Sequence, residues 1–502
     1  MSSRIVDASG TEHSGLVILD GIGMGVEDVV RLADGAARPV PGTDGMRRAD
    51  ASWNAARQIA ATGRVYGRST GVGANRNEDV PTEAAAGHGL RLLRSHAGAI
   101  GEELPARQVR AMLAVRANQL LAGGAGLRPT VVTALCEALE AGAYPVVNEF
   151  GSVGTGDIAA LAQVGLALAG EHPWRGEKAP DPQPLDNNDA LALISSNALT
   201  LGQSALALHE LRGLIEATQV VAALSLLAVD GSHEAYAAPV HAARPHRGSV
   251  EVARRMRELI GAADRPTPPL GRIQDPYGFR CVPQIHGPAL DAADALEQVL
   301  AIEINAAAEN PLISSEDLAA YHHGGFYQAQ LALALDHFRL AVTQVARLST
   351  SRLSSLNEPA FTRLRPFLAD PEPASSGVMI LEYAAGAALG DLRAFSAPAS
   401  LGHAVLSRGV EEQASFASLA ARQTLRACRA YRLVVGCELV AAVRALRQRD
   451  LRPEPGLGVG LALELAEAVL EADPADRPLT DDVTAAAGLL DRFTDIWRGS
   501  TS

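Results

Sequence analysis

Long stretches in which alanine and leucine recur at helical spacing most constrain how this chain can fold. The longest runs from residue 190 to residue 229 and is nearly continuous. A helix that is apolar on most sides must be buried, either within one protomer or between protomers. Because aromatic residues make up only 4% of the chain and β-branched alternation is scarce, we expect a mainly α protein. Further long helical patterns, which would complete a bundle, cover residues 288–308, 327–354, 379–395 and 411–447.

The 502 residues are enough for one large domain or for two to three ordinary ones. We expect a loop-rich N-terminal region over residues 1–190, in which shorter helices alternate with glycine-rich segments. A central bundle of long helices follows over residues 191–450. Two more helical patterns occupy the C-terminal region, residues 451–502.

Composition limits the classes of partner. The net charge of −13, without any basic block, argues against nucleic acid or an anionic membrane surface as the main partner. The N-terminus lacks the apolar core of a signal peptide, and charged or polar residues interrupt each apolar run before about 18 positions accumulate. We therefore expect a cytoplasmic protein with reduced thiols and no metal site, because no CxxC or metal-type spacing links its cysteines, which are Cys136, Cys281, Cys428 and Cys437.

A glycine-rich stretch, Gly-Ser-Val-Gly-Thr-Gly-Asp at residues 151–157, precedes a clear helical pattern. Its three glycines allow the backbone to fold back on itself, and a loop that opens a helix presents N–H groups and a positive dipole end. No Gly-Lys-Ser/Thr follows, which argues against a phosphate loop, and no βαβ alternation supports a dinucleotide site. Taken alone, the stretch favours a tight turn in which Asp157 caps the helix.

Two other segments concentrate groups that can move protons or bind carboxylates. Tyr66 lies in a glycine-rich loop at 65–73, where it is either a packed loop residue or a general base whose pKa its neighbours lower. Arg280 belongs to the polar segment 272–284, which two prolines restrain. Its guanidinium is suited either to bidentate binding of a carboxylate or to a structural salt bridge.

Two further segments have simple explanations when each is considered alone. His96 follows Arg94 and Ser95 at the end of a helical pattern, where a histidine commonly interacts with the helix C-terminus. Glu411 stands at the predicted start of the helix 411–447, where an acidic residue commonly interacts with the helix dipole.

Together these five segments resemble the aromatic amino acid ammonia-lyase family, and most closely its histidine ammonia-lyase branch. They follow the family's order along the chain, and shorter matches support them at 309–312 (Glu-Asn-Pro-Leu), 325–326 and 375–380. The resemblance implies the long central helix bundle of histidine and phenylalanine ammonia-lyases. It also implies a homotetramer whose active sites are shared between protomers, and a small amino acid as substrate.

The resemblance further implies a reaction in which ammonia is eliminated from an α-amino acid, leaving an α,β-unsaturated acid. The family needs no added cofactor or metal, because an Ala-Ser-Gly triad cyclises and loses two waters to give a methylidene-imidazolone electrophile. The residues implied to be catalytic are Tyr66 as the base that takes the β-proton, Tyr277, Glu411 and the trio Gly154, Thr155 and Gly156. Those implied to bind substrate are His96, Gln274, Arg280, Phe326 and Asn197.

This chain departs from the family where the electrophile should form. Its loop is one residue shorter, and Gly154, Thr155 and Gly156 stand where the Ala-Ser-Gly triad belongs. The trio can still cyclise in principle, although threonine would leave an ethylidene whose extra methyl crowds the electrophilic carbon. The alternative is that no prosthetic group forms. Asn197 lies two positions from the family's asparagine, so its role is the least directly transferred.

Three hypotheses follow. The first is an ammonia-lyase that acts on histidine, as the Ser95-His96 pair indicates, or on a related aromatic amino acid. The second is a divergent enzyme that works without the prosthetic group, or an aminomutase. The third is a relative without catalytic activity that binds an amino acid.

Overall fold

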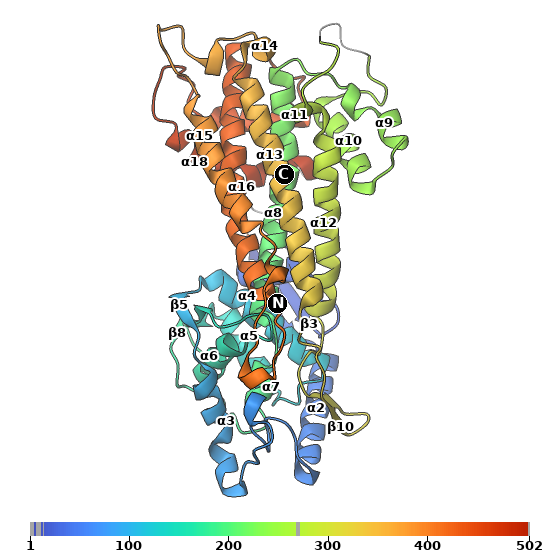
Figure 1. The fold of residues 1–502 in the computed structure, drawn as a ribbon, viewed down its shortest axis with the longest axis vertical. Coiled ribbons are helices and arrows are strands. Elements are labelled where there is room, and N and C mark those ends of the chain that lie inside the picture. Colours follow the sequence, from blue (N-terminus) through green and yellow to red (C-terminus); the bar gives the residue numbers. More distant parts are fainter. Residues whose placement is uncertain (1–4, 7–11, 14, 268–271, 500–502) are drawn as a thin grey trace. The chain divides into compact units, whose positions relative to one another are not determined.

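The computed structural model describes residues 5–6, 12–13, 15–267 and 272–499 (Figure 1). The chain divides into two units, each made of three separate stretches. Unit 1 comprises Met1–His209, Leu296–Leu335 and Pro398–Arg422. Unit 2 comprises Glu210–Ala295, Asp336–Ala397 and Gln423–Ser502. The three regions predicted from the sequence are continuous and so divide the chain differently; they remain a prediction.

Unit 1 is organised around α4 (Ala106–Ala122), which is buried almost continuously from Val109 to Leu121. Helices α1, α2 and α5 pack against α4, and α3 and α7 pack against α6. The remaining bounds are α1 (Val26–Ala33), α2 (Thr43–Thr62), α3 (Thr82–His96), α5 (Thr130–Glu140), α6 (Ile158–Leu168) and α7 (Ala190–Ile194).

Short two-stranded sheets connect these helices. The antiparallel pair of β5 (Ile100–Glu103) and β7 (Asn148–Phe150) leads directly into the glycine-rich loop, and α6 begins directly after it. One element on each side therefore fixes the two ends of residues 151–157. The other pairs are β1 (Ile5–Val6) with β2 (Glu12–His13), β3 (Leu16–Leu19) with β4 (Arg38–Pro41), β6 (Tyr144–Pro145) with β8 (Trp174–Arg175), and β9 (Leu312–Ser314) with β10 (Ala319–Tyr321).

Four long helices contribute residues to both units and run side by side as a bundle in unit 2 (Figure 1). They are α8 (Ala198–Ala228), α12 (Val282–Glu303), α13 (Ala329–Leu356) and α16 (Ala417–Gln448). The other helices of unit 2 are α9 (Ala238–Ala242), α10 (Arg247–Ile260), α11 (Tyr277–Arg280), α14 (Pro359–Thr362), α15 (Ile380–Phe395), α17 (Gly458–Val469) and α18 (Thr480–Arg498).

Buried polar bonds connect three helices of this bundle. The carboxylate of Glu438 on α16 forms an ion pair of 2.6 Å with Arg352 on α13, and both side chains are completely buried. Ser225 on α8 and Ser349 on α13 also donate hydrogen bonds to Glu438, at 2.7 and 2.5 Å. A charge removed from water is costly unless it is paired and hydrogen-bonded, and here both conditions are met.

The structure confirms the prediction of a mainly α fold with a long helix bundle and corrects several boundaries. The 190–229 pattern is two helices, α7 and α8, because the chain bends at Ser195. The helix predicted to begin at 288 begins at Val282 and contains Pro288. The helix predicted to begin at Glu411 begins only at Ala417, since Phe416 has a φ of +54°, outside the helical region.

The segment Ala190–Ala228 is the one stretch of the described residues that has the length and hydropathy of a membrane span. Within the structure, 83% of its most apolar window is buried. Protein atoms therefore cover this apolar surface, as the sequence pattern predicted.

Candidate active site

The glycine-rich loop turns sharply at its second and third glycines. Gly154 has a φ of +88° and Gly156 a φ of +108°, left-handed values that side chains with a Cβ rarely adopt. The hydroxyl of Ser152 spans the turn, because it accepts a hydrogen bond from the Gly154 N–H at 3.1 Å and donates one to the Gly156 carbonyl at 3.0 Å. Thr155 is thereby held at the tip of the turn.

Residues 415–418, from the last of the three stretches that form unit 1, hydrogen-bond to this loop. We call them the clamp. The N–H of Phe416 donates to the Val153 carbonyl at 2.8 Å. The Ser415 hydroxyl donates to the Gly154 carbonyl at 2.8 Å, and the Ser418 hydroxyl donates to the Ser152 carbonyl at 2.9 Å. Three consecutive carbonyls of the loop, at 152, 153 and 154, are thus hydrogen-bonded by one short segment.

Asp157 joins the loop to a second helix. It stands at the N-cap position of α6, but its carboxylate makes no capping bond there. Instead it accepts hydrogen bonds from the N–H and hydroxyl of Thr200, in the first turn of α8, at 2.7 and 2.9 Å. The prediction that the Asp157 side chain caps α6 is therefore wrong. Its carboxylate binds the first turn of α8 instead. Burial raises the pKa of this carboxyl.

A cavity of about 330 Å³ lies beside the loop, a volume suited to a small molecule. Five of the residues predicted from the sequence line it: Tyr66, Thr155, Gly156, Phe326 and Glu411. The α6 N-terminus, at Ile158, is also in its wall, so the positive end of a helix dipole favours negative charge here. The structure therefore brings five predicted residues to one place.

Tyr66 lines this cavity from the loop that follows α2. The hydroxyl accepts a hydrogen bond from the Gly73 N–H at 2.8 Å, and the ring meets that of His322 edge to face at 6.2 Å. Burial raises the pKa of Tyr66, and the negative charge of Glu411 adds to the rise, while the Gly73 N–H and Arg76 oppose it. The lowered pKa that would activate a tyrosine base is therefore not found in the single chain.

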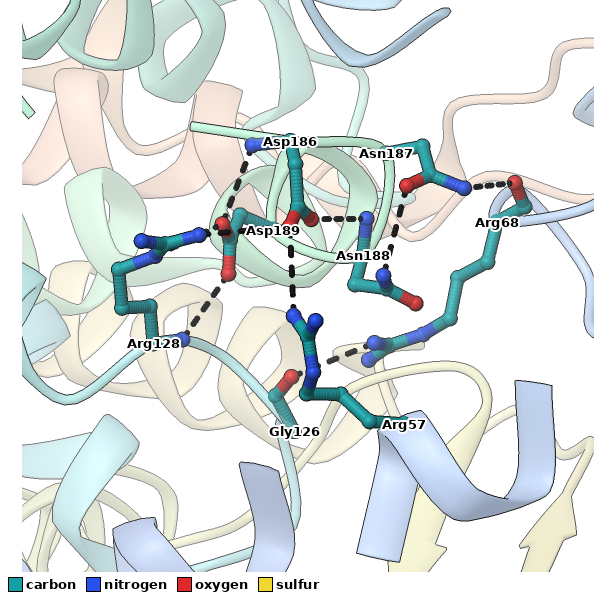
Figure 2. A network of polar contacts seen from close by, with 8 residues as sticks. All are labelled: Arg57, Arg68, Gly126, Arg128, Asp186, Asn187, Asn188 and Asp189. Atoms are coloured by element: carbon teal, nitrogen blue, oxygen red, sulfur yellow. Dashed lines mark hydrogen bonds and ion pairs between the residues drawn. The ribbon is translucent and has the colours of Figure 1, made fainter. Parts of the chain in front are cut away.

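The Tyr66 loop is anchored by a buried arginine two residues further on (Figure 2). Arg68 donates to the carbonyls of Ala125 and Gly126 at 2.8 and 3.3 Å, and Asn187 donates to the Arg68 carbonyl at 3.0 Å. Burial lowers the pKa of the guanidinium to about 10. The surrounding ion pairs visible in Figure 2, Arg57 with Asp186 and Arg128 with Asp189, hold the segment that supplies Asn187.

Two predicted residues of unit 1 lie elsewhere. Asn197 is buried and donates to the Phe326 carbonyl at 2.7 Å, but it is not among the described residues that line the cavity. Its carbonyl oxygen has no hydrogen-bond partner within the described part of the chain. His96 closes α3 with its Nδ1 atom 2.9 Å from the Leu92 carbonyl, and it is likewise absent from the described cavity wall. The helix C-terminal role is the one that the geometry of His96 matches.

The remaining three predicted residues, Gln274, Tyr277 and Arg280, belong to unit 2. Gln274 is exposed, and Tyr277 is 66% exposed. The Arg280 guanidinium lies 4.3 Å from the centre of the Tyr277 ring, and its Nε atom is buried without a partner among the described residues.

Sequence reasoning missed several residues of the cavity and its support. Arg76, Asn310 and His322 line the cavity, and Ser415 holds the loop. The doublet His322-His323 before two glycines was an available signal, because such polar doublets in glycine-rich loops are candidates for binding. Ser415 gave no signal of its own, since its role arises only from its contact with residue 154.

Comparisons with known proteins agree with this arrangement. The aromatic amino acid lyase family matches residues 24–469. The histidine ammonia-lyase of Geobacillus kaustophilus (strain HTA426) is 35% identical over 453 residues, covering 86% of this chain and 89% of that protein.

Two solved structures share the fold over almost the whole chain. The ergothioneine-degrading enzyme Ergothionase from Treponema denticola has a TM-score of 0.88 and 26% identity, covering 96% of this chain and 99% of that one. The tyrosine aminomutase from Streptomyces globisporus has a TM-score of 0.89 and 25% identity, covering 96% and 98%. Since the family match and the homology both extend over most of the sequence, this chain belongs to the aromatic amino acid lyase family and is a carbon–nitrogen lyase.

Proposed function

We propose that this protein eliminates ammonia from histidine or a related aromatic L-amino acid, with an electrophile formed from Gly154, Thr155 and Gly156. One observation carries the proposal: Thr155 and Gly156 line the same cavity as Tyr66 and Glu411. A site for β-elimination needs a base, a group that binds the amino group of the substrate, and an electrophile. All three must lie within reach of one small substrate.

The residues of the loop fit the imidazolone that the family implies. Ring closure joins the Gly156 nitrogen to the Gly154 carbonyl carbon, which requires a tight turn, and both glycines have left-handed φ values. Glycine at 156 leaves the nucleophilic nitrogen unhindered, and Thr155 faces the cavity. When formed, the group supplies an electrophilic carbon that makes loss of a weakly acidic β-proton feasible.

The chain's own side chains provide the acid–base and binding functions. Tyr66 takes the β-proton, and the Gly73 N–H stabilises the phenolate by its hydrogen bond. Glu411 binds the amino group or the imidazole of the substrate, and Phe326 packs against its ring. Arg280 binds the substrate carboxylate, and Tyr277 and Gln274 face the prosthetic group. The clamp at 415–418 keeps Thr155 directed toward the cavity.

We further propose a cytoplasmic homotetramer in which several protomers complete each active site. Tyr277 and Ile273 are exposed in the single chain, at 66% and 94%, although they belong to the same short segment as Arg280, the arginine proposed to bind the carboxylate. On α15, Ile380 and Tyr383 are also exposed, at 58% and 68%. Apolar exposure of this kind marks surfaces that another protein covers. A monomer in light scattering would contradict this assembly.

The mass of the peptide spanning residues 151–157, from purified protein, tests the proposed electrophile. A mass short by two waters is the expected result. An unmodified mass would contradict the proposal and favour a divergent enzyme that works without the group.

Product analysis with histidine, tyrosine and phenylalanine then separates the activities. An unsaturated acid and ammonia indicate the lyase, whereas a β-amino acid indicates an aminomutase, the activity named for the Streptomyces globisporus relative. Binding of these amino acids without any product would favour a relative without catalytic activity.

A further inference from the structure

An amide nitrogen and an amide carbonyl do not react with each other without help. In the trio, the Gly156 nitrogen is a weak nucleophile and the Gly154 carbonyl a weak electrophile, because resonance stabilises both peptide groups. Ring closure therefore needs either a donor that draws electron density from the Gly154 carbonyl or an environment that stabilises the oxyanion formed there.

One side chain of the described structure has this position. Ser415 is buried, with 4% of its surface exposed, and its hydroxyl donates to the Gly154 carbonyl at 2.8 Å. The same hydroxyl accepts a hydrogen bond from the Ala417 N–H at 3.3 Å. This second bond occupies a lone pair of Ser415, directs its proton toward Gly154 and strengthens the bond that it donates.

The first turn of α16 adds to the effect. A Cβ built on Gly154 would lie 2.8 Å from the Phe416 nitrogen and 2.9 Å from the Ala417 nitrogen, so the start of this 32-residue helix faces Gly154. The N-terminus of a long helix carries roughly half a positive charge, which stabilises an oxyanion close to it.

Residue 154 and Ser415 also fit each other sterically. The Cβ of any other residue at 154 would lie only 2.2 Å from the Ser415 hydroxyl oxygen. Glycine at 154, which has no Cβ, leaves room for that hydroxyl. Gly154 is therefore compatible with a serine whose hydroxyl contacts its own carbonyl, the one proposed to react.

We propose that Ser415 is the residue that activates Gly154 for cyclisation, so that this chain forms its electrophile from Gly-Thr-Gly in place of Ala-Ser-Gly. The inference rests on the proposed function, because it concerns how the proposed electrophile arises. Ser415 acts on the backbone of the protein and does not contact the substrate, so it is a positioning residue for the later reaction.

The chemistry balances without an added reactant. The Gly156 nitrogen forms a bond to the Gly154 carbon and loses its proton, while the Gly154 oxygen takes a proton through Ser415. That oxygen leaves as the first water, with the proton of the Thr155 nitrogen, as a C=N bond forms. The Thr155 hydroxyl and the proton on its Cα leave as the second water, as a C=C bond forms.

Peptide mass tests the inference without relying on enzyme activity. The fraction of peptide 151–157 that is short by two waters is measured over time in wild-type protein and in Ser415→Ala. Removing a single oxyanion donor commonly slows a reaction by about 10²–10³-fold, so the modified fraction in the variant should fall at least about tenfold at early times.

Two further serine variants serve as controls. Ser204→Ala removes a similarly buried hydroxyl that donates to a backbone carbonyl within α8. In this variant the fraction of modified peptide 151–157 should equal that of wild type. Ser418→Ala removes a bond of the same clamp that ends on residue 152, not on the reacting carbonyl. If Ser418→Ala lowers modification as much as Ser415→Ala does, clamping alone drives cyclisation and the inference is overturned.

The outcomes separate this inference from the function on which it rests. Unmodified wild-type peptide overturns both the electrophile and the role of Ser415. Modified wild type together with equally modified Ser415→Ala overturns only the role of Ser415. Circular dichroism of each variant confirms that the comparison is made between folded proteins, and Ser415→Cys, with its weaker donor, should show an intermediate rate.

Discussion

Among single residues, Tyr66 has an environment that favours its protonated form, whereas its proposed role as a base requires the deprotonated form. A base must lose its proton, yet burial and the charge of Glu411 raise the pKa of this hydroxyl above its ordinary value of about 10. The phenolate is then a small fraction of the enzyme at neutral pH. Its share grows about tenfold for each unit by which the pH rises toward that pKa.

We therefore expect kcat/KM to increase about tenfold per pH unit between about pH 7 and pH 8.5. Tyr66→Phe keeps the ring against His322 but removes the base, so kcat should fall about 10²–10⁴-fold with an unchanged melting temperature. Tyr144→Phe, a tyrosine outside the described cavity wall, is the matched control. A pH-independent profile, or normal activity in Tyr66→Phe, would exclude Tyr66 as the base.

Among the elements, α11 depends on its neighbours for its position. This four-residue helix carries Tyr277 and Arg280, and it is too short to be stable alone. The Tyr236 hydroxyl donates to the Phe279 carbonyl at 2.6 Å, and Arg352 donates to the Gly278 carbonyl at 3.2 Å. Both donors are almost completely buried, so they hold the backbone between the two side chains proposed to bind substrate and prosthetic group.

Tyr236→Phe should therefore weaken substrate binding more than catalysis. Loss of one buried hydrogen bond costs about 1 kcal/mol. If this whole cost weakens the hold on Arg280 in its binding position, KM should rise about fivefold. Tyr431→Phe is the control, because it loses an equally buried bond of 2.6 Å, to Thr218, that does not touch α11. Equal KM values in the two variants would show that Tyr236 has only a structural role.

The elements also show what could be read from the sequence. Periodicity located the long helices because burial repeats every three to four residues along each of them. It could not find the bend at Ser195 or the start of α16, where Phe416 has a left-handed φ and its N–H bonds to the distant Val153 carbonyl. Contacts between distant segments, such as Ser415 with Gly154 or Asp157 with Thr200, leave no periodic pattern to detect.

The candidate site was predictable to the extent that its residues share short motifs. Tyr66, Thr155, Gly156, Phe326 and Glu411 were each expected from such motifs and line one cavity. His96 followed the same reasoning, but the side chain turns back to its own helix, because the Leu92 carbonyl lies within hydrogen-bond distance. A motif identifies a segment, whereas the direction of each side chain depends on local bonds.

For the molecule as a whole, the buried pair of Arg352 and Glu438 should dominate the response to mutation. Arg352→Met leaves a completely buried carboxylate without its partner, which costs about 3–5 kcal/mol in the free energy of unfolding. The double variant Arg352→Met with Glu438→Leu should recover most of that loss, since an apolar pair of similar volume avoids the unpaired charge.

The measurement is equilibrium unfolding in urea, followed by circular dichroism. Arg47→Met serves as the control, because Arg47 and Asp44 form an ion pair whose side chains are 73% and 71% exposed, and such pairs contribute about 0–1 kcal/mol. Similar losses in Arg352→Met and Arg47→Met would contradict the importance assigned to the buried pair.

The clamp on the glycine-rich loop has a consequence for when the protein matures. Ser415 and Gly154 are separated by 261 positions in the chain. At about 5–20 residues per second, a ribosome needs roughly 10–50 s to synthesise that interval. During this time the nascent loop has no serine against its carbonyl, so the cyclisation that we assign to Ser415 must wait until that residue has been synthesised. If Ser415 has this role, the order of synthesis delays cyclisation until the segment that clamps the loop has been made.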